Sequence, residues 1–238
     1  MTEKSSFDAR FQCITENYKE ITENIASAAV RSGREPSAVR FMAVTKTVEP
    51  VYINYALSLG IDLIGENKVQ ELLSKLGYIE KKDVEKHIIG HLQSNKVRKI
   101  ITEVSMVQSL DSVSLAREIS RQAERNSVNM DVLLEVNVGE EASKTGFRYE
   151  ETAPAAAEIA EMPGITVRGL MAVPPLDAEE EELRGYFRRM RALFDALKGG
   201  KTAFDTLSLG MSGDYITAIE EGATLVRIGS ALFGARRY

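Results

Sequence analysis

Short apolar runs alternate with amphipathic helical stretches along most of this chain, and this alternation limits its fold more than any other feature. Each run is rich in β-branched residues and is bounded by polar residues, glycine or proline, as expected of a buried strand. Strands that alternate with helices form parallel sheets, because a parallel pair needs a crossover connection. The eight predicted strands cover 39–46, 62–67, 87–91, 106–109, 132–138, 167–173, 206–209 and 225–229.

Eight strand–helix units fit one closed (β/α)8 barrel, the TIM barrel, which is an α/β fold of a single domain. The chain of 238 residues has the size at which such barrels run as one domain. We therefore predict one domain over 1–238, with an extra N-terminal helix over about 7–33 and the barrel over about 39–235. An open doubly wound sheet is the alternative, because strand–helix alternation alone does not force a sheet to close.

The extra helix is predicted from apolar residues that recur at steps of three and four between Phe11 and Ala28. Ser32 and Gly33 end it with the usual C-terminal glycine. Cys13 lies beside the apolar stripe, and we expect it to pack there. Because it is the one cysteine of the chain, an internal disulfide is excluded, and a reducing compartment is indicated.

Composition and charge exclude several classes of function. A formal net charge of −5 gives no basic field for nucleic acid. No run of about 18 apolar residues predicts a membrane span, and the first residues lack the apolar core of a signal peptide. We expect a cytoplasmic protein that binds neither nucleic acid nor membrane. A monomer is expected too, because a closed barrel with a net negative surface shows no evident extra interface.

The first predicted strand ends in Lys46, which is an unusual place for a lysine. One interpretation is a strand-end side chain that reaches solvent, because lysine is almost never fully buried unless it is paired. The other is that the mouth of a barrel partly desolvates the amine and favours its neutral form. A neutral amine can attack an aldehyde and form a Schiff base.

The loops after strands seven and eight are the usual phosphate-binding place of a TIM barrel. The first of these loops carries Gly210, Ser212 and Gly213, which let backbone amides approach an anion and add a hydroxyl donor. The second opens with Gly229 and Ser230 at the start of a short helix, whose amides and dipole favour phosphate. Each loop alone is compatible with a plain tight turn, but the two together predict a phosphate site.

Arg227 has the same strand parity as Leu225 and Gly229, so its side chain should point into the barrel or its mouth. A buried arginine needs an acceptor. An ion pair with a strand carboxylate such as Glu135 is one interpretation, and a hydrogen bond to the ring nitrogen of a ligand is the other.

A lysine amine, a phosphate cradle and an arginine around one mouth suit pyridoxal 5′-phosphate (PLP). The aldehyde would condense with Lys46, the phosphate would lie on Ser212, Gly229 and Ser230, and the ring nitrogen would face Arg227. Arginine does not readily give up a proton, so the ring nitrogen would stay unprotonated. An unprotonated ring is a weaker electron sink.

Motifs along nearly the whole chain resemble those of the pyridoxal phosphate homeostasis proteins, which are similar to the barrel domain of alanine racemase. The motifs are AVTKT at 43–47, GEN at 65–67, HIIGHLQSNK at 87–96, RGLM at 168–171, LGMS at 209–212 and VRIGS at 226–230. The resemblance implies a single barrel that takes part in intracellular PLP (vitamin B6) homeostasis without established catalysis. PLP-dependent apo-enzymes are candidate recipients of the cofactor.

The same resemblance implies roles for individual residues. Lys46 is the Schiff-base lysine, and Arg227 faces the ring nitrogen. The residues implied to hold the phosphate are Ser212, Gly229 and Ser230, and those implied to lie near the site with less defined roles are Asn67, His87 and Met171. Many relatives carry a second lysine two places after the Schiff-base lysine, where this chain has Val48. Lys144 is either its substitute in a hand-off of the cofactor or a solvated loop lysine.

His87 and His91 share a face of the predicted third strand, but no Cys/His cluster completes a metal site. We expect no metal, and we expect His87 to be a hydrogen-bonded structural histidine.

Two enzyme functions compete with a PLP-binding homeostasis protein. A PLP-dependent amino-acid racemase needs acid–base groups on both faces of the substrate's α-carbon. Lys46 can supply one, but Tyr238 is a terminal residue and is poorly positioned to supply the other. An aldolase-type barrel would also use a lysine amine, but class I aldolase barrels usually place it on a later strand.

Overall fold

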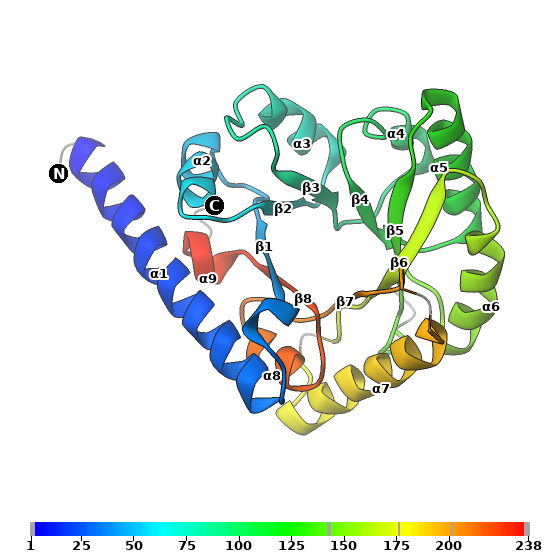
Figure 1. The fold of residues 1–238 in the computed structure, drawn as a ribbon. Helices are drawn as coiled ribbons and strands as arrows, with labels where there is room; N and C mark the ends of the chain where they lie inside the picture. Colours follow the sequence, from blue (N-terminus) through cyan, green and yellow to red (C-terminus); the bar gives the residue numbers. More distant parts are fainter. Residues whose placement is uncertain (1–2, 142–143, 176, 201, 236–238) are drawn as a thin grey trace.

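The computed structural model of the chain describes residues 3–141, 144–175, 177–200 and 202–235. Eight parallel strands close into one barrel, in which each strand pairs with the next and the last pairs with the first (Figure 1). The strands are β1 (Arg40–Val44), β2 (Leu63–Glu66), β3 (Glu85–Ile88), β4 (Met106–Leu110), β5 (Met130–Glu135), β6 (Ile165–Met171), β7 (Thr206–Ser208) and β8 (Leu225–Ile228). The predicted TIM barrel is confirmed, and the open sheet is excluded.

Helices surround the barrel, and α1 lies along its outside next to α8 and α9 (Figure 1). The helices are α1 (Glu3–Arg31), α2 (Pro50–Ser58), α3 (Val69–Leu76), α4 (Ser94–Val97), α5 (Val113–Asn126), α6 (Tyr149–Ala160), α7 (Glu180–Lys198), α8 (Tyr215–Glu220) and α9 (Ser230–Phe233). α5 begins where the Ser112 hydroxyl accepts a hydrogen bond from the Leu115 amide at 3.3 Å, which is a normal N-terminal cap. None of the described helices is both long and apolar enough to cross a membrane.

Three strands begin two residues before the positions predicted for them. β3, β5 and β6 start at polar or weakly apolar stretches, whose side chains pair at the amino end of the barrel. Glu85 binds Arg40 at 2.8 Å, and Asp131 binds Arg168 at 2.6 Å. Hydrophobic periodicity cannot detect a strand end that is stabilised by ion pairs across neighbouring strands. β3 also ends at Ile88, so His91 lies in the loop beyond the strand rather than on it.

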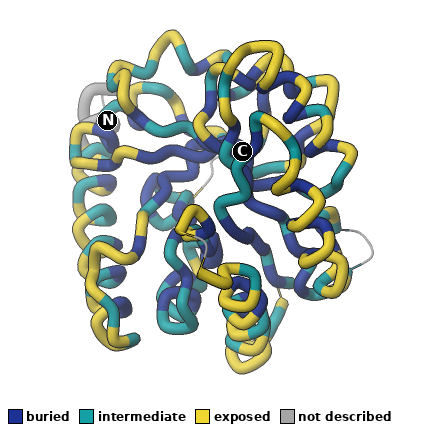
Figure 2. Tube along the Cα trace, turned by 45° about the vertical axis from the view of Figure 1, so that its right-hand side comes forward, coloured by how far each residue is buried: buried dark blue, intermediate teal, exposed yellow. Residues whose placement is uncertain are grey.

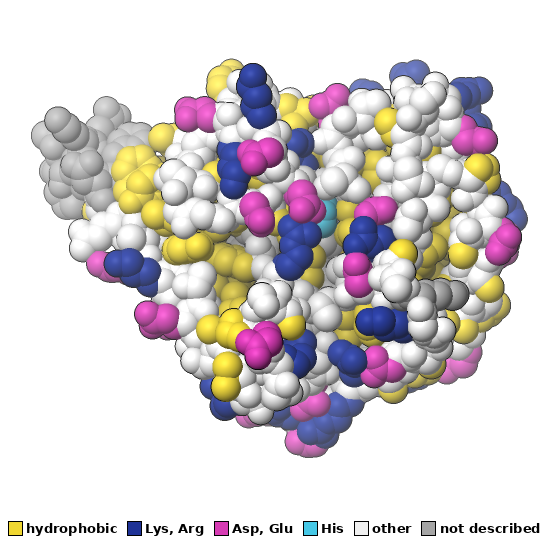
Figure 3. Space-filling view, viewed as in Figure 1, with side chains coloured by type: hydrophobic (Ala, Val, Ile, Leu, Met, Phe, Trp, Pro, Cys, Tyr) yellow, Lys and Arg dark blue, Asp and Glu magenta, His cyan; other side chains and the backbone are white. Residues whose placement is uncertain are grey.

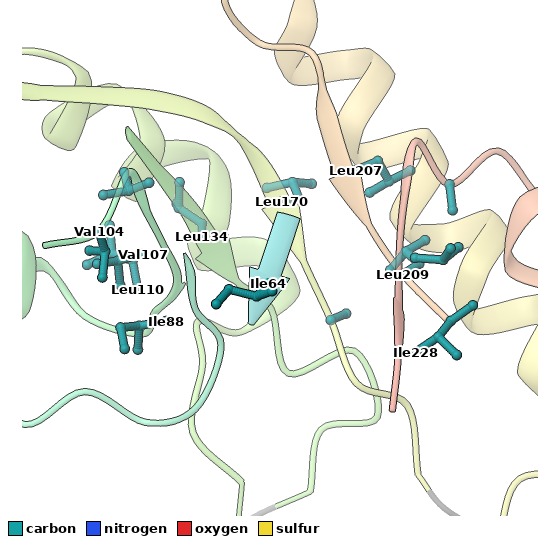
Figure 4. Close-up of a cluster of buried hydrophobic side chains, with 14 of the residues drawn as sticks. Ile64, Ile88, Val104, Val107, Leu110, Leu134, Leu170, Leu207, Leu209 and Ile228 are labelled. Atoms are coloured by element: carbon teal, nitrogen blue, oxygen red, sulfur yellow. The ribbon is translucent and has the colours of Figure 1, made fainter. Parts of the chain in front are cut away.

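Apolar side chains fill two regions, one between the sheet and the helices and one inside the barrel. Figure 4 shows part of the outer layer, to which nearly every strand contributes. The residues labelled there are Ile64, Ile88, Val104, Val107, Leu110, Leu134, Leu170, Leu207, Leu209 and Ile228. Two smaller separate clusters, centred on Met42 and on Met171, have members from different strands. Because both sides of the sheet are covered, β2 and β4 are buried along their whole length (Figure 2).

The N-terminal helix α1 packs through the predicted stripe, with Ile14, Ile21, Ile25 and Ala28 buried. It ends at Arg31, two residues before the predicted end. The expectation that Cys13 packs against this stripe is wrong, because its side chain is exposed and accepts only a weak contact from Asn17 at 3.5 Å. A position next to an apolar stripe on a helix faces solvent when the stripe is narrow.

β6 and β7 approach each other closely at Gly169. This glycine has φ 150°, and a Cβ atom at this position would lie 1.8 Å from the Thr206 carbonyl oxygen. The β5–β6 register shifts next to it, between Val132 and Leu133. A side chain at residue 169 would therefore separate β6 from β7.

Candidate cofactor site

Lys46 follows β1 at the carboxyl end of the barrel, in the loop that leads to α2, and its side chain is half-buried. Successive side chains alternate along a strand, so Lys46 continues the side of β1 that carries the interior residue Met42. Thr47 next to it has φ 63°, a conformation that β-branched residues rarely adopt. Charged side chains of both signs lie side by side over the middle of the molecule in Figure 3.

A buried ion-pair network braces the loop that carries this lysine. The Lys75 amine on α3 donates to the Thr45 carbonyl at 2.8 Å, to Glu66 Oε1 at 2.6 Å and to Glu71 Oε1 at 2.7 Å. The Thr45 hydroxyl also donates to Glu66 Oε1 at 2.8 Å, and the Thr47 amide donates to Glu71 Oε1. The backbone on both sides of residue 46 is therefore tied to one amine.

The two carboxylates of this network respond differently to their surroundings. Burial raises the pKa of Glu66, and the hydrogen bond from Lys75 only partly opposes it. Burial also acts on Glu71, but hydrogen bonds from Lys75 and from the Thr47 amide outweigh it and lower its pKa. Glu66 Oε2 is buried and has no hydrogen-bond partner among the described residues, so Lys75 is the cation that offsets the burial of this carboxylate.

The loop after β7 and the turn after β8 meet at Ser212. Its hydroxyl oxygen accepts hydrogen bonds from the amides of Gly229 at 3.1 Å and Ala231 at 3.2 Å. Both acceptor positions of the oxygen are then occupied, so the hydroxyl hydrogen remains to be donated. Ser230 lies between these amides and is exposed. A Cβ atom on Gly229 would lie 3.3 Å from Val44 Cβ, so glycine lets β8 end close to β1.

Gly210 shapes the first of these loops. It has φ 85°, and a Cβ atom there would lie 2.9 Å from Tyr215 Cα. Asp214 closes the loop by accepting a hydrogen bond from the Met211 amide, while burial raises the pKa of Asp214. α9 is a single turn, so the helix-dipole contribution expected at its start is small. The Ser212 hydroxyl, held by the amides of Gly229 and Ala231, is therefore the main donor of this loop pair, which we call the Ser212 cradle.

Arg227 points into the barrel, as its parity predicts, and only 4% of its surface is exposed. It donates to the Ser208 carbonyl at 2.8 Å, to the Ser208 hydroxyl at 2.7 Å and to the Ala172 carbonyl at 2.9 Å. Burial lowers its pKa to about 10, which nearby Asp214 and Glu135 oppose. The acceptors of Arg227 among the described residues are these neutral oxygens, and no ion pair with Glu135 is formed there.

Asn67 and Met171 lie at the carboxyl ends of their strands. Asn67 directly follows β2 and is half-buried. It packs so closely on the loop after β3 that a Cβ atom on Gly90 would lie 2.5 Å from the Asn67 carbonyl oxygen. Met171 ends β6 and is buried in an interior cluster with Met106 and Leu133.

His87 lies on β3 and is buried, with 1% of its surface exposed. Its Nδ1 atom is 2.9 Å from Gln108 Nε2, so the predicted hydrogen bond is present, while the structural role stays a prediction. Burial lowers the pKa of His87, and Glu85 opposes this shift. His91 is separate from it and binds Asp111 at 2.8 Å. Within the described part of the chain, no group of three or more His, Cys, Asp or Glu residues could hold a metal ion.

Lys144 bridges two loops at the carboxyl end of the barrel. Its amine lies 2.6 Å from Glu141 Oε1 and donates to the carbonyls of Pro174 at 3.2 Å and Val173 at 3.4 Å. Three oxygens therefore lie around the amine, although 30% of the side chain is still exposed. Val48, at the position of the relatives' second lysine, is 8% exposed and belongs to the apolar core.

Sequence reasoning missed Lys75 and Ser208, whereas the strand positions already place Gln108 at the carboxyl end of the fourth predicted strand. Lys75 has the signal of an ordinary surface helix, and its burial depends on Glu66 from another element. Gln108 and Ser109 are polar residues in a strand whose other members are apolar, which is a usable signal for an interior network. Tyr238, considered above as an acid–base group, lies outside the described residues.

The residues fit PLP. The carboxyl end of the barrel carries the half-buried amine of Lys46 and the Ser212 hydroxyl, whose hydrogen is left for an anion and whose oxygen is held by neighbouring amides. The Arg227 guanidinium, which keeps its protons, lies on β8. These groups match the aldehyde, the phosphate and the ring nitrogen of this cofactor.

Comparison with known proteins gives consistent results. Residues 17–237 match the family "Alanine racemase, N-terminal domain". A pyridoxal phosphate homeostasis protein of Aquifex aeolicus is 42% identical over 94% of this chain and 98% of its own length. PipY of Synechococcus elongatus, in a structure with PLP bound, is 31% identical with a TM-score of 0.78, covering 90% of this chain and 100% of that one.

A Clostridium difficile alanine racemase shares the fold alone, at 14% identity and a TM-score of 0.75, and the match covers 95% of this chain and 58% of the racemase. The similarity to the homeostasis proteins, in contrast, extends over nearly the full length of both chains at an identity that defines a common family. The chain therefore belongs to the pyridoxal phosphate homeostasis protein family, whose barrel is that of the alanine racemase N-terminal domain.

Proposed function

We propose that this protein binds PLP covalently through Lys46 and takes part in intracellular PLP homeostasis without catalysing a reaction of its own. The observation that carries the proposal is the Ser212 cradle, in which two amides bind the hydroxyl oxygen and leave its hydrogen to be donated, at the same end of the barrel as a braced lysine. The PLP-bound PipY structure and the names of the relatives support the choice of cofactor. PLP supplies an aldehyde that condenses with an amine and releases water.

Each residue has one task in this proposal. Lys46 supplies the amine, and Lys75 fixes the loop on which it stands. Ser212 donates its hydroxyl hydrogen to the phosphate, together with donors around Gly229 and Ser230. Arg227 donates a hydrogen bond to the ring nitrogen. Asn67 and Met171 are at the carboxyl ends of β2 and β6, where they would limit the space around the ring.

The proposed absence of catalysis rests on Arg227. A pKa of about 10 leaves the guanidinium protonated at neutral pH, so the ring nitrogen that it faces receives a hydrogen bond and no proton. A cofactor that is unprotonated on its ring nitrogen stabilises a carbanion poorly. The relatives' names, which describe homeostasis rather than a reaction, agree with this interpretation.

Borohydride reduction followed by peptide mass spectrometry tests the covalent link. We expect the reduced adduct on the peptide that contains Lys46 and its complete loss in Lys46→Ala. Lys68→Ala is the matched control, because Lys68 is an exposed lysine on the next loop and should leave the adduct intact. An adduct of unchanged yield on another lysine in Lys46→Ala would refute the assignment.

Dialysis of the loaded protein tests the phosphate cradle. Each hydroxyl–phosphate hydrogen bond contributes roughly 1.5–3 kcal/mol, so Ser212→Ala with Ser230→Ala should weaken PLP binding by ten-fold or more. Ser58→Ala is the control, because that hydroxyl is exposed on α2 and bonds only to the Tyr55 carbonyl. Equal retention of PLP by the double variant and the parent would contradict the cradle.

Incubation of the loaded protein with L-alanine, followed by chiral chromatography, separates a carrier from a racemase. We expect no D-alanine at an enzymatic rate. A turnover of about 1 s⁻¹ or more would favour the racemase-like alternative. Mixing the loaded protein with a PLP-dependent apo-enzyme and following the recovery of activity tests the proposed transfer to recipients.

A further inference from the structure

A continuous chain of hydrogen bonds crosses the interior of the barrel from β8 to β3. Arg227 donates to the Ser208 hydroxyl at 2.7 Å, and this hydroxyl donates to Gln108 Oε1 at 2.7 Å. Gln108 Nε2 lies 2.9 Å from His87 Nδ1. Glu85 Oε2 is 3.5 Å from the other ring nitrogen, His87 Nε2. The chain therefore joins the arginine of the proposed cofactor site to the amino end of the barrel.

The direction of each link in the structure follows from the donors and acceptors at its two ends. A guanidinium has five N–H donors and no acceptor, so the Ser208 oxygen must accept from Arg227. The single hydroxyl hydrogen of Ser208 then goes to the carbonyl oxygen of Gln108. The Gln108 amide group consequently donates to His87 Nδ1, which must be unprotonated. His87 is therefore neutral, with its proton on Nε2 and directed toward Glu85.

The members of this hydrogen-bond chain are buried, so they cannot exchange their partners for water. Ser208 and Gln108 are completely buried, His87 is 1% exposed and Arg227 is 4% exposed. The interior of such a barrel is normally filled by branched apolar side chains. A polar chain in that place needs partners for its members, and here the three links have good geometry, while His87 Nε2 at the end of the chain is buried without a hydrogen-bond partner among the described residues.

We infer that Ser208, Gln108 and His87 are positioning residues that fix the direction of the Arg227 donors, and that the protonation state of His87 sets the polarity of the chain. The part of this inference that concerns the cofactor rests on the proposed function, in which Arg227 faces the ring nitrogen. The charged groups that face His87 are Glu85 on β3, Arg40 on β1 and Asp131 on β5.

Protonation of His87 would reverse the chain. Both ring nitrogens would then be donors, so the Gln108 side chain would have to turn its carbonyl oxygen toward Nδ1. Its amide group would point at the Ser208 oxygen, which would receive two N–H donors and lose the acceptor of its own hydrogen. The anchor of Arg227 would be rearranged without any movement of the backbone.

Long-range ¹H–¹⁵N NMR correlation on the cofactor-free protein tests the polarity directly. The chain has two histidines, so the exposed His91 provides an internal reference for the imidazole of His87. We expect the pattern of a neutral ring protonated on Nε2 at pH 7. Gln108→Glu replaces the donor with a carboxylate and should raise the pKa of His87 by about 1–3 units. A neutral ring that carries its proton on Nδ1 would overturn the inference.

Variants that break or restore single hydrogen bonds of the chain test its effect on PLP binding. We expect Ser208→Ala and His87→Leu to raise the dissociation constant for PLP about tenfold and to shift the pH at which the absorption of bound PLP changes. His87→Asn should recover most of the parental spectrum, because its side-chain oxygen can accept from Gln108. Ser58→Ala is the matched control for Ser208→Ala.

The outcomes separate the two proposals. A parent protein that takes up no PLP would contradict the proposed function, while the NMR result would still judge the polarity of the chain. A parent that binds PLP, with Ser208→Ala and His87→Leu folded and spectrally unchanged, would overturn the positioning role alone. Recovery of the parental spectrum in His87→Asn but not in His87→Leu would support it, because simple loss of packing does not distinguish an acceptor from a non-acceptor.

Discussion

Lys75 holds three oxygen atoms from three different residues, and it does so next to the lysine that we propose to bind PLP. Its amine replaces water as the partner of the Glu66 carboxylate, whose side chain is fully buried. A buried charge is tolerated only with such a partner, and the partner's removal costs more than the pair contributes. The network therefore couples the stability of the barrel to the shape of the Lys46 loop.

Lys75→Met should lower the free energy of unfolding by about 3–5 kcal/mol, because it leaves Glu66 charged and unpaired. The pKa of Glu66 is already raised by burial and would rise further. A folded-state pKa above the unfolded value means that stability is retained at low pH and lost as the pH rises. The difference in unfolding free energy between Lys75→Met and the parent, measured by urea unfolding, should therefore become smaller toward pH 4.5. A deficit that is equal at pH 4.5 and pH 8 would contradict this account, and Lys68→Met is the surface control.

Acid should destabilise the protein in two steps. Burial lowers the pKa of His87 from 6.5, so the unfolded chain binds more protons below that pH, and stability falls as the pH drops below about 6.5. His87 and Arg40 hold the pKa of Glu85 at about 2, so its contribution is lost between about 4.5 and 2. Urea unfolding from pH 8 to pH 3 measures both steps. The loss of stability below about pH 6.5 should be absent in His87→Asn. If it persists in that variant, another group causes it.

Some site residues can be predicted from sequence because one residue carries the signal. Lys46 ends an apolar strand, and Arg227 has inward parity, so each is found without knowledge of its neighbours. Gln108 and Ser208 are different, because their meaning depends on a contact between residues that are 100 positions apart. Their network becomes visible only when the barrel brings β4 and β7 across from each other.

At the scale of the elements, the contact between β6 and β7 depends on the absence of one side chain. β7 has only three residues and pairs with β6 at three positions, beginning at Gly169 and Thr206. The sequence predicts both strands, because each has an apolar run. It does not predict the close approach, because a glycine in a strand also suits a bulge or a bend.

Gly169→Ala should destabilise the protein by at least about 3 kcal/mol, because its Cβ atom would overlap the Thr206 carbonyl oxygen, and an overlap with backbone cannot be relieved by a rotamer change. Gly185→Ala is the matched control. Gly185 lies inside α7 with open space around it, so alanine should stabilise the helix by about 0.5–1 kcal/mol. Thermal unfolding followed by circular dichroism measures both changes, and a stable Gly169→Ala protein would refute the close approach.

At the scale of the whole molecule, the number and order of strands could be predicted, because each strand–helix unit repeats the same apolar pattern. Closure could be predicted only by analogy with other eight-unit proteins, since the pairing of β1 with β8 joins opposite ends of the sequence. The ion pairs at the amino end of the barrel, such as that of Arg168 with Asp131, are consequences of closure and leave no periodic trace in the sequence.

A monomer remains our prediction for the oligomeric state. The large apolar side chains exposed in the described part of the chain are Val30, Val51 and Tyr78, which lie on or after three different helices rather than in one patch. Size-exclusion chromatography with light scattering should give 26.3 kDa at all concentrations. A mass of twice this value that persists on dilution would contradict the prediction.

The position of α1 against α8 and α9 has a consequence for folding during synthesis of the chain. Lys46 leaves the ribosome early. The elements made last are β8, which pairs with β1, and the helices α8 and α9, which pack on α1. Until then β1 has an unpaired edge, and an unpaired edge can join another nascent chain. The proposed phosphate cradle lies in the segment that closes the barrel. A molecule of PLP bound both to Lys46 and to this cradle would therefore stabilise the complete chain and none of the shorter ones. The vitamin would then act as a folding aid for its own carrier.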